Sequence, residues 1–133
     1  MSESARGLLD TSVVIDHAMI DPARLPEETA IAAITLAELA AGPHATNDAD
    51  ERARRQDRLQ WAIATWDPLP FDAEAARAFA RVFAAVRSAG LSTRSRLADL
   101  LIAATAAAND VPLYTRNPAD FAALASIVRI VPV

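Results

Sequence analysis

Short apolar runs alternate with longer segments of helical periodicity along this chain. Four runs have a length typical of buried strands: residues 7–9, 30–34, 111–115 and 127–131. Helical spacing marks the segments between them: residues 13–19, 36–41, 50–66, 72–88 and 97–108. Because strands that are apolar throughout and separated by helices pair in parallel, the pattern predicts an α/β fold. We expect one domain over residues 1–133, with a mostly parallel central sheet of four to five short strands flanked by helices.

Cap and breaker residues indicate where these elements end. Thr35 is placed to cap the helix over residues 36–41, which Gly42-Pro43 then ends. Asp72 is placed to cap a long alanine-rich helix that reaches about residue 88, and Gly90 closes it. The segment between the two longest helices, residues 67–71, predicts a turn with a possible edge strand.

Composition excludes several kinds of site. The chain has no cysteine, which rules out a disulfide framework, a thiolate metal site and a catalytic thiol. Its 13 basic residues are all arginine, a side chain that grips phosphate or carboxylate with two parallel hydrogen bonds. A net charge of −4 argues against a protein that coats nucleic acid through bulk positive charge, but is compatible with an enzyme that holds nucleic acid locally.

Nothing in the sequence predicts a membrane association. No stretch approaches the roughly 18 consecutive apolar residues of a membrane span. The N-terminus is short and polar and lacks the charged-then-apolar layout of a signal peptide. We therefore expect a soluble, cytoplasmic protein.

Four acidic residues fall where an open parallel sheet places its chemistry, beyond the carboxyl ends of the strands. Asp10 follows the first predicted strand, Glu38 lies one helical turn after the second, and Asp120 follows the third along the chain. Asp99 lies early in the helix that leads to that third strand. We expect all four side chains to converge on one rim of the sheet.

Three of these acids also have purely structural interpretations. Asp10 can be an N-cap, and Thr35 with Glu38 fits a capping box, in which the glutamate reaches back to the cap amide. Asn117 and Asp120 fit a helix start, with proline at the first position and an acid in the first turn. The sequence leaves both interpretations open for each of them.

Asp99 differs because its helix is apolar on nearly every face. An unpaired buried carboxylate costs several kcal/mol, so Asp99 requires a partner, either an arginine or a metal ion shared with the other acids. Converging carboxylates need a counter-charge, which hard divalent cations such as Mg²⁺ or Mn²⁺ supply. His17 and His44 have no second histidine at ligand spacing and are expected at the surface or its boundary.

Four segments in the same order resemble the PIN-domain family, and more narrowly the VapC toxins of bacterial toxin–antitoxin pairs. They are residues 8–16 (LLDTSVVID), 34–39 (ITLAEL), 97–106 (LADLLIAATA) and 113–121 (LYTRNPADF). The resemblance implies that Asp10, Glu38, Asp99 and Asp120 form an acidic Mg²⁺ site. It also implies that Ser12, Thr115 and Asn117 are polar residues around that site.

The function implied by the resemblance is Mg²⁺-dependent endonucleolytic cleavage of RNA, by a toxin that a VapB-type antitoxin holds inactive. The resemblance also implies a homodimer. Arg94, Arg96 and Arg116 adjoin the site in sequence and are candidates for holding the phosphodiester, whereas the arginines at positions 52, 54, 55 and 58 predict a solvated helix face. Two alternatives stay open: a PIN nuclease with a housekeeping role in RNA processing, and a non-catalytic binding module whose acids only cap helices.

Overall fold

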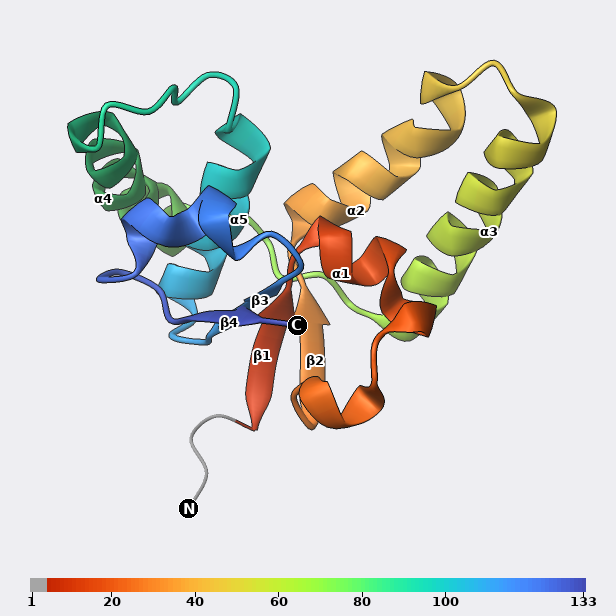
Figure 1. The fold of residues 1–133 in the computed structure, drawn as a ribbon, viewed down its shortest axis with the longest axis horizontal. Helices are drawn as coiled ribbons and strands as arrows, with labels where there is room; N and C mark the ends of the chain where they lie inside the picture. Colours follow the sequence, from red (N-terminus) through yellow and green to blue (C-terminus); the bar gives the residue numbers. More distant parts are fainter. Residues whose placement is uncertain (1–4) are drawn as a thin grey trace.

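A four-stranded parallel sheet forms the centre of the computed structural model, which describes residues 5–133 (Figure 1). Its strands are β1 (Arg6–Leu9), β2 (Glu28–Ile31), β3 (Leu113–Thr115) and β4 (Ile130–Pro132). Their order in the sheet is β2-β1-β3-β4, and each neighbouring pair is parallel. The predicted α/β fold with a parallel sheet is confirmed.

Helices connect the strands and cover the sheet. The α-helices are α1 (Thr11–Ile15), α2 (Ala33–Ala41), α3 (Ala49–Thr65), α4 (Ala73–Ser88) and α5 (Leu97–Ala108). Short 3₁₀ helices are η1 (His17–Met19), η2 (Pro22–Arg24), η3 (Gly42–Ala45) and η4 (Pro118–Leu124). As predicted, Asp72 caps α4 by accepting a hydrogen bond from the backbone N–H of Ala75, at 3.0 Å. Gly90 follows α4 with a φ of +77°, a conformation that glycine adopts without strain. No described helix is long and apolar enough to cross a membrane.

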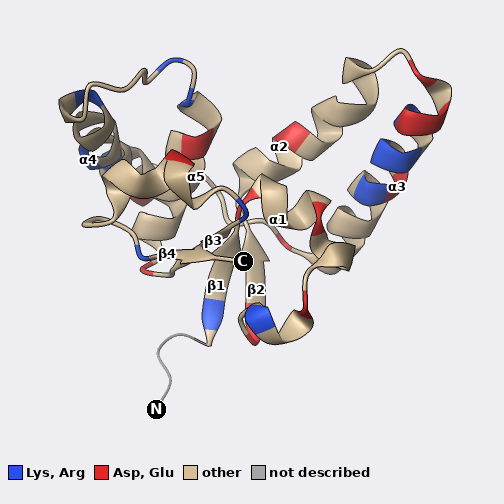
Figure 2. Ribbon diagram, viewed as in Figure 1, with Lys and Arg blue, Asp and Glu red and all other residues tan. Residues whose placement is uncertain are grey.

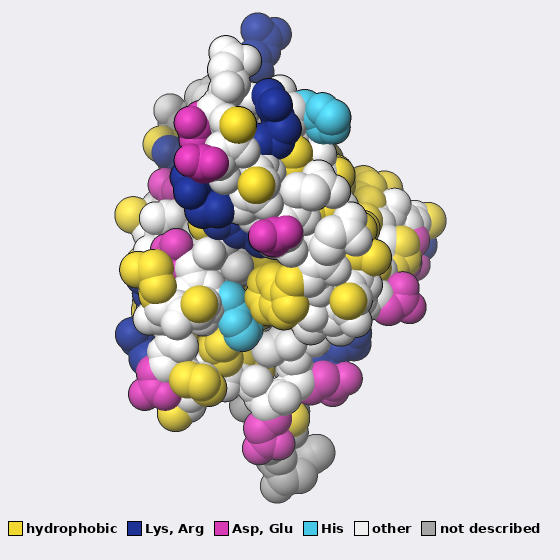
Figure 3. All heavy atoms as spheres, turned by 90° about the vertical axis from the view of Figure 1, so that its right-hand side faces the viewer, with side chains coloured by type: hydrophobic (Ala, Val, Ile, Leu, Met, Phe, Trp, Pro, Cys, Tyr) yellow, Lys and Arg dark blue, Asp and Glu magenta, His cyan; other side chains and the backbone are white. Residues whose placement is uncertain are grey.

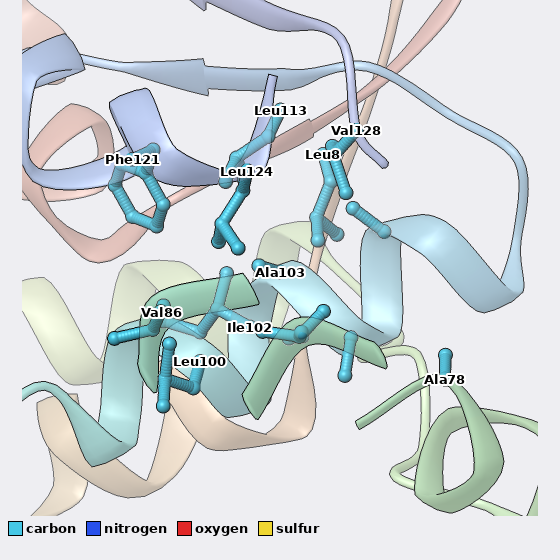
Figure 4. Close-up of a cluster of buried hydrophobic side chains, with 14 of the residues drawn as sticks. Leu8, Ala78, Val86, Leu100, Ile102, Ala103, Leu113, Phe121, Leu124 and Val128 are labelled. Atoms are coloured by element: carbon cyan, nitrogen blue, oxygen red, sulfur yellow. The ribbon is translucent and has the colours of Figure 1, made fainter. Parts of the chain in front are cut away.

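Successive side chains of β1 enter two different cores, as the period of a strand requires. Leu8 packs into the larger core with residues of α4, α5 and η4, among them Phe121 and Leu124 (Figure 4). Leu9 packs into the second core with residues of α1, α2 and α3. The two helical groups therefore lie on opposite faces of the sheet, and β1 between them carries Asp10 at its carboxyl end.

Several predicted elements have different bounds in the structure, among them the second strand, which is Glu28–Ile31 instead of 30–34. Helix α2 begins at Ala33, with Ala32 as its N-cap, so Thr35 lies inside the first turn instead of capping it. The last strand begins at Ile130 instead of 127, because the backbone N–H groups of residues 127 and 128 both donate to the carbonyl of Leu124 and close a turn after η4. The possible edge strand at 67–71 amounts to one bridge between Ala32 and Leu69.

Candidate active site

Asp10 is fixed in place by its neighbours at the end of β1. It is 4% exposed and accepts a hydrogen bond from the backbone N–H of Val13, so it is the N-cap of α1, one of the two roles that the sequence left open for it. Its two carboxylate oxygens also accept from side chains: Oδ1 from the Ser12 hydroxyl, and Oδ2 from the Thr115 hydroxyl at 2.7 Å. These three hydrogen bonds hold the Asp10 carboxyl group in one orientation.

Glu38 is exposed on α2 and is held by a residue of α1. The Thr11 hydroxyl donates to its Oε1 at 2.5 Å and lies 3.1 Å from the hydroxyl of the buried Thr35. Because Thr35 is not the N-cap, the capping-box interpretation of Glu38 is wrong. The carboxylate is turned toward α1 and the end of β1, where it can act with Asp10.

The pKa of Asp99 reports that the other three acids are close. Asp99 lies in the first turn of α5 and is half-buried. Burial, followed by the negative charges of Asp120, Asp10 and Glu38, raises the pKa of this carboxyl from 3.8 to about 6. The nearby Arg96 opposes that rise but forms no ion pair with it, and no other described arginine does. Of the two partners that the sequence left open for Asp99, an arginine ion pair does not form within residues 5–133, and the charges of the three other acids act on its carboxyl.

Asp120 and Asn117 are exposed at the start of η4, next to β3. The backbone N–H of Asn117 donates to the Thr115 hydroxyl at 2.9 Å, and the side chain of Asn117 makes no cap hydrogen bond. Arg96 Nη1 donates to the backbone carbonyl of Asp120 at 3.1 Å, which ties the segment before α5 to η4. Thr115 thus holds both Asp10 and the turn that presents Asp120.

The side-chain oxygen atoms of these residues are of the type that binds a hydrated Mg²⁺ or Mn²⁺ ion. Carboxylate and hydroxyl oxygens are the hard ligands that such cations prefer, and burial together with the charges of three neighbouring acids raises the pKa of Asp99. Among residues 5–133, no three acidic or histidine side chains stand close enough to share one ion as they are placed. Mg²⁺ keeps several of its waters and binds proteins through one or two carboxylates, so the site suits a partly hydrated ion.

Of the three candidate phosphate-binding arginines, only two are free to serve. Arg116 Nε pairs with Asp16 Oδ2 at 3.3 Å and its Nη1 donates to the carbonyl of Val133, so its guanidinium is committed to the fold. Arg96 binds a carbonyl beside Asp99, and Arg94 is exposed on the same segment. Figure 2 shows acidic positions on α2 and α5 facing each other above the sheet, with basic positions on the segment before α5.

A family model described as the PIN domain matches residues 7–127. This chain belongs to the PIN-domain family. It is 40% identical over 134 residues to ribonuclease VapC5 of Mycobacterium tuberculosis, across 97% of this chain and 96% of that protein. It is 41% identical over 104 residues to ribonuclease VapC8 of the same species, across 75% of this chain and 89% of that protein.

The fold of this PIN domain matches a solved toxin–antitoxin structure. The crystal structure of VapBC-5 from Mycobacterium tuberculosis, a member of the VapBC family of toxin–antitoxin systems, superposes with a TM-score of 0.85 at 41% identity. The match covers 97% of this chain and 99% of that one. The resemblance to VapC-type PIN domains drawn from the four sequence segments is confirmed.

Two groups of polar residues in this PIN domain were misjudged from the sequence. Thr11 was not singled out, although it directly follows Asp10 at a helix start, and it holds Glu38. Arg52 and Arg55 were assigned to a solvated face, but they donate to backbone carbonyls of Gly42, Pro43 and Thr46 at η3. Helix ends leave such carbonyls without partners, so these arginines fasten η3 to α3.

Proposed function

We propose that this PIN domain is a Mg²⁺-dependent endoribonuclease, with Mn²⁺ as a possible substitute, and that it is the toxin of a VapBC-type pair. The relatives named as ribonucleases align over most of their length and of this chain, which supports RNA as the substrate. The observation that carries the proposal is that the half-buried Asp99 has a raised pKa, caused by burial and then by the negative charges of Asp120, Asp10 and Glu38, three acids from other segments of the chain. Carboxylates that act on one another in this way need a counter-charge, and a bound divalent cation supplies it.

Each acid has a separate part in the proposed reaction. Asp10 and Glu38 are held by hydroxyl donors, so their oxygens face the site in fixed directions. Asp99 must lose its proton to bind the cation, and Asp120 completes the negative rim. A bound divalent cation supplies activation of water and neutralises charge on the phosphate and on the leaving oxygen. Arg96 and Arg94 lie on the adjoining segment and are placed to contact the RNA backbone.

This scheme needs no histidine or nucleophilic serine. His44 is exposed and His17 packs against Trp61, with ring centroids 5.0 Å apart, so neither reaches the acids. Ser12 is engaged with Asp10 and with the backbone N–H of Arg116, which suits a positioning role. Thr115 and Asn117 likewise serve to orient the acids in this proposal.

Control by a partner belongs to the same proposal. An antitoxin segment that places an arginine among the four acids would form charge-assisted hydrogen bonds with them and displace the cation. Apolar side chains exposed near the site offer further contact area: Ile15 is 46% exposed and Trp61 is 37% exposed. The similarity to the solved VapBC-5 structure, a member of the VapBC family of toxin–antitoxin systems, supports a VapB-type partner for this chain.

The experiment is incubation of the purified protein with total cellular RNA, in Mg²⁺ and in chelator, followed by mapping of the cleaved ends. The proposal predicts defined internal cuts in Mg²⁺ that disappear in chelator. Cutting that continues in chelator, or no cutting with either divalent ion, would refute it. Inhibition by the product of a neighbouring small reading frame would separate a toxin from a housekeeping nuclease.

A further inference from the structure

A cavity of about 320 Å³ opens beside Glu38, on the side of the acidic rim away from α5. It lies between α1, α2 and α3 and is lined by Thr11, Ile15, Glu38, Leu39, Gly42, Glu51, Arg55 and Arg58. Thr11 and Glu38 belong both to this lining and to the site described above, so the cavity directly adjoins the candidate active site. Ligand pockets in proteins hold about 300–1,000 Å³, which makes this one suited to a single small group.

One cation in this lining is available to a ligand. Arg55 is committed, because its Nε pairs with Glu51 Oε2 at 2.8 Å and its Nη1 donates to the carbonyl of Gly42. Arg58 is half-buried, and within residues 5–133 its guanidinium has no hydrogen bond and no ion pair. Figure 2 shows basic positions along α3 and an acidic position on α2. A guanidinium whose donors are unused, and which lies beside the acidic rim, is suited to bind a phosphate group.

Arg58 also joins this cavity to a second one. A neighbouring cavity of about 480 Å³ shares Ile15 and Arg58 and is lined further by His17 and Trp61. On this face, hydrophobic side chains surround a histidine, with charged side chains above them (Figure 3). A strand of nucleic acid leaving the acidic rim at Glu38 therefore meets first a small, partly apolar cavity and then an arginine next to aromatic rings. Single-stranded RNA is bound by this combination of arginine and aromatic side chains.

We infer that the cavity beside Glu38 binds the nucleoside adjacent to the scissile phosphate, and that Arg58 contacts the next phosphate of the RNA. This inference rests on the proposed ribonuclease function. If the scissile phosphate lies at the four acids, the adjacent nucleoside must lie within one nucleotide of them, and the cavity at Glu38 is within that reach. Ile15 and Leu39 supply apolar walls for a ribose or a base, and the cavity holds one such unit.

The test measures binding of a fluorescein-labelled single-stranded RNA by fluorescence anisotropy, in protein that carries Asp99→Asn and does not cut it. Arg58→Ala should weaken RNA binding about tenfold, the usual effect of losing a hydrogen bond to a charged group. Arg58→Lys should retain part of the affinity, since it keeps the charge without the bidentate geometry. The matched control is Arg54→Ala, which removes an exposed arginine from the same helix and should change binding less than twofold.

A second measurement uses the protein without Asp99→Asn. Arg58→Ala should change the positions at which RNA is cut, while hydrolysis of bis(p-nitrophenyl) phosphate, a diester without a nucleoside, stays within twofold of the parent. Equal RNA affinity of the Arg58→Ala and Arg54→Ala proteins would overturn the inference. So would a result in which Arg58→Ala weakens only binding to a partner protein. RNA binding that depends on Arg58 in a protein that never cuts RNA would support the phosphate contact of Arg58, but it would refute the nuclease proposal and with it the placement of a nucleoside beside a scissile phosphate.

Discussion

The Thr11 hydroxyl donates a hydrogen bond to the carboxylate of Glu38, with 2.5 Å between Oγ1 and Oε1. The bond joins the first turn of α1, which Asp10 caps, to the outer face of α2. The hydroxyl of Thr35, on the same helix as Glu38, lies 3.1 Å from the hydroxyl of Thr11. Two acids on different elements are thereby held in one orientation relative to each other, one by its position as a cap and the other by a neighbouring hydroxyl.

Replacing that hydroxyl should impair catalysis more than folding. Thr11→Val keeps the shape of the side chain but leaves Glu38 without its donor, and we expect kcat/KM for RNA to fall about tenfold. Thr11→Ser, which restores the hydroxyl, should recover most of the activity. The measurement is steady-state cleavage of an RNA oligonucleotide, with Tm recorded for each variant. Equal activity of the Thr11→Val and parent proteins would show that Glu38 needs no such orientation.

Thr115→Val should reduce both stability and activity. Thr115 is fully buried, donates to Asp10 Oδ2, and accepts from the backbone N–H of Asn117, so the substitution leaves the buried Asp10 Oδ2 and the part-buried N–H of Asn117 without these partners. We expect the free energy of unfolding to fall by about 1–3 kcal/mol, measured by urea denaturation. Thr65→Val, which removes an exposed hydroxyl at the end of α3, is the control and should change it by less than about 0.5 kcal/mol.

Asp99→Asn should stabilise the metal-free protein in a pH-dependent manner. The pKa of Asp99 is raised from 3.8 to about 6, so between these values the folded state binds more protons than the unfolded state. Stability from this group is therefore present below pH 3.8 and lost as the pH rises through 6. At pH 7.5 the loss is about 1 kcal/mol after allowance for solvent screening, and Asp99→Asn should raise Tm by roughly 3–5 °C.

The pH dependence supplies its own control. At pH 4 the parent carboxyl is largely protonated in the folded state, so the parent and Asp99→Asn proteins should have nearly equal Tm values. Mg²⁺ should raise the Tm of the parent at pH 7.5 and have a smaller effect on the variant, because a ligand stabilises the state that binds it. A variant less stable than the parent at pH 7.5 would mean that Asp99 is satisfied by a partner within the fold.

Self-association is expected from the apolar side chains left at the surface. Met19 is 77% exposed and Ile63 is 53% exposed, and both lie with Ile15 and Trp61 on elements of the same half of the molecule. Ile63 lies on α3, and its exposure marks an apolar surface suited to a partner. Light scattering at micromolar concentration should give twice the 14.2 kDa chain mass. A mass near 14.2 kDa would contradict the proposed homodimer.

The sequence predicted the sheet and the positions of the acids because both follow from local patterns. Apolar runs mark buried strands, and the carboxyl end of a parallel strand is where Asp10, directly after β1, and the turn that leads from β3 to Asp120 must emerge. The α5 helix was equally clear, since only Leu97 among its large apolar residues is about half exposed. The helix start at Ala33 was missed because alanine is a poor N-cap, and Thr35 carries the local signal for that role.

Contacts between distant segments were not available from the pattern. Thr11 and Glu38 are 27 positions apart, and neither segment contains a sequence signal that predicts the hydrogen bond between them. Arg116 was a candidate phosphate ligand because of its place beside Asn117. In the structure its guanidinium pairs with Asp16, 100 positions away in the sequence. Arg58 looked like its neighbours on α3, and only the packing of α3 against η3 distinguishes Arg52 and Arg55, which bind backbone carbonyls, from Arg58, which does not.

The central claim is that four acids act together as the metal site of a ribonuclease, and Asp99→Asn tests it most directly. The measurement is the rate of RNA cleavage at saturating Mg²⁺ by the parent, by Asp99→Asn and by Asp67→Asn, the last a neutralised exposed acid outside the site. The account predicts a loss of at least about 100-fold for Asp99→Asn, with the fold retained, and parent-like activity for Asp67→Asn. Full activity in the Asp99→Asn protein would contradict it.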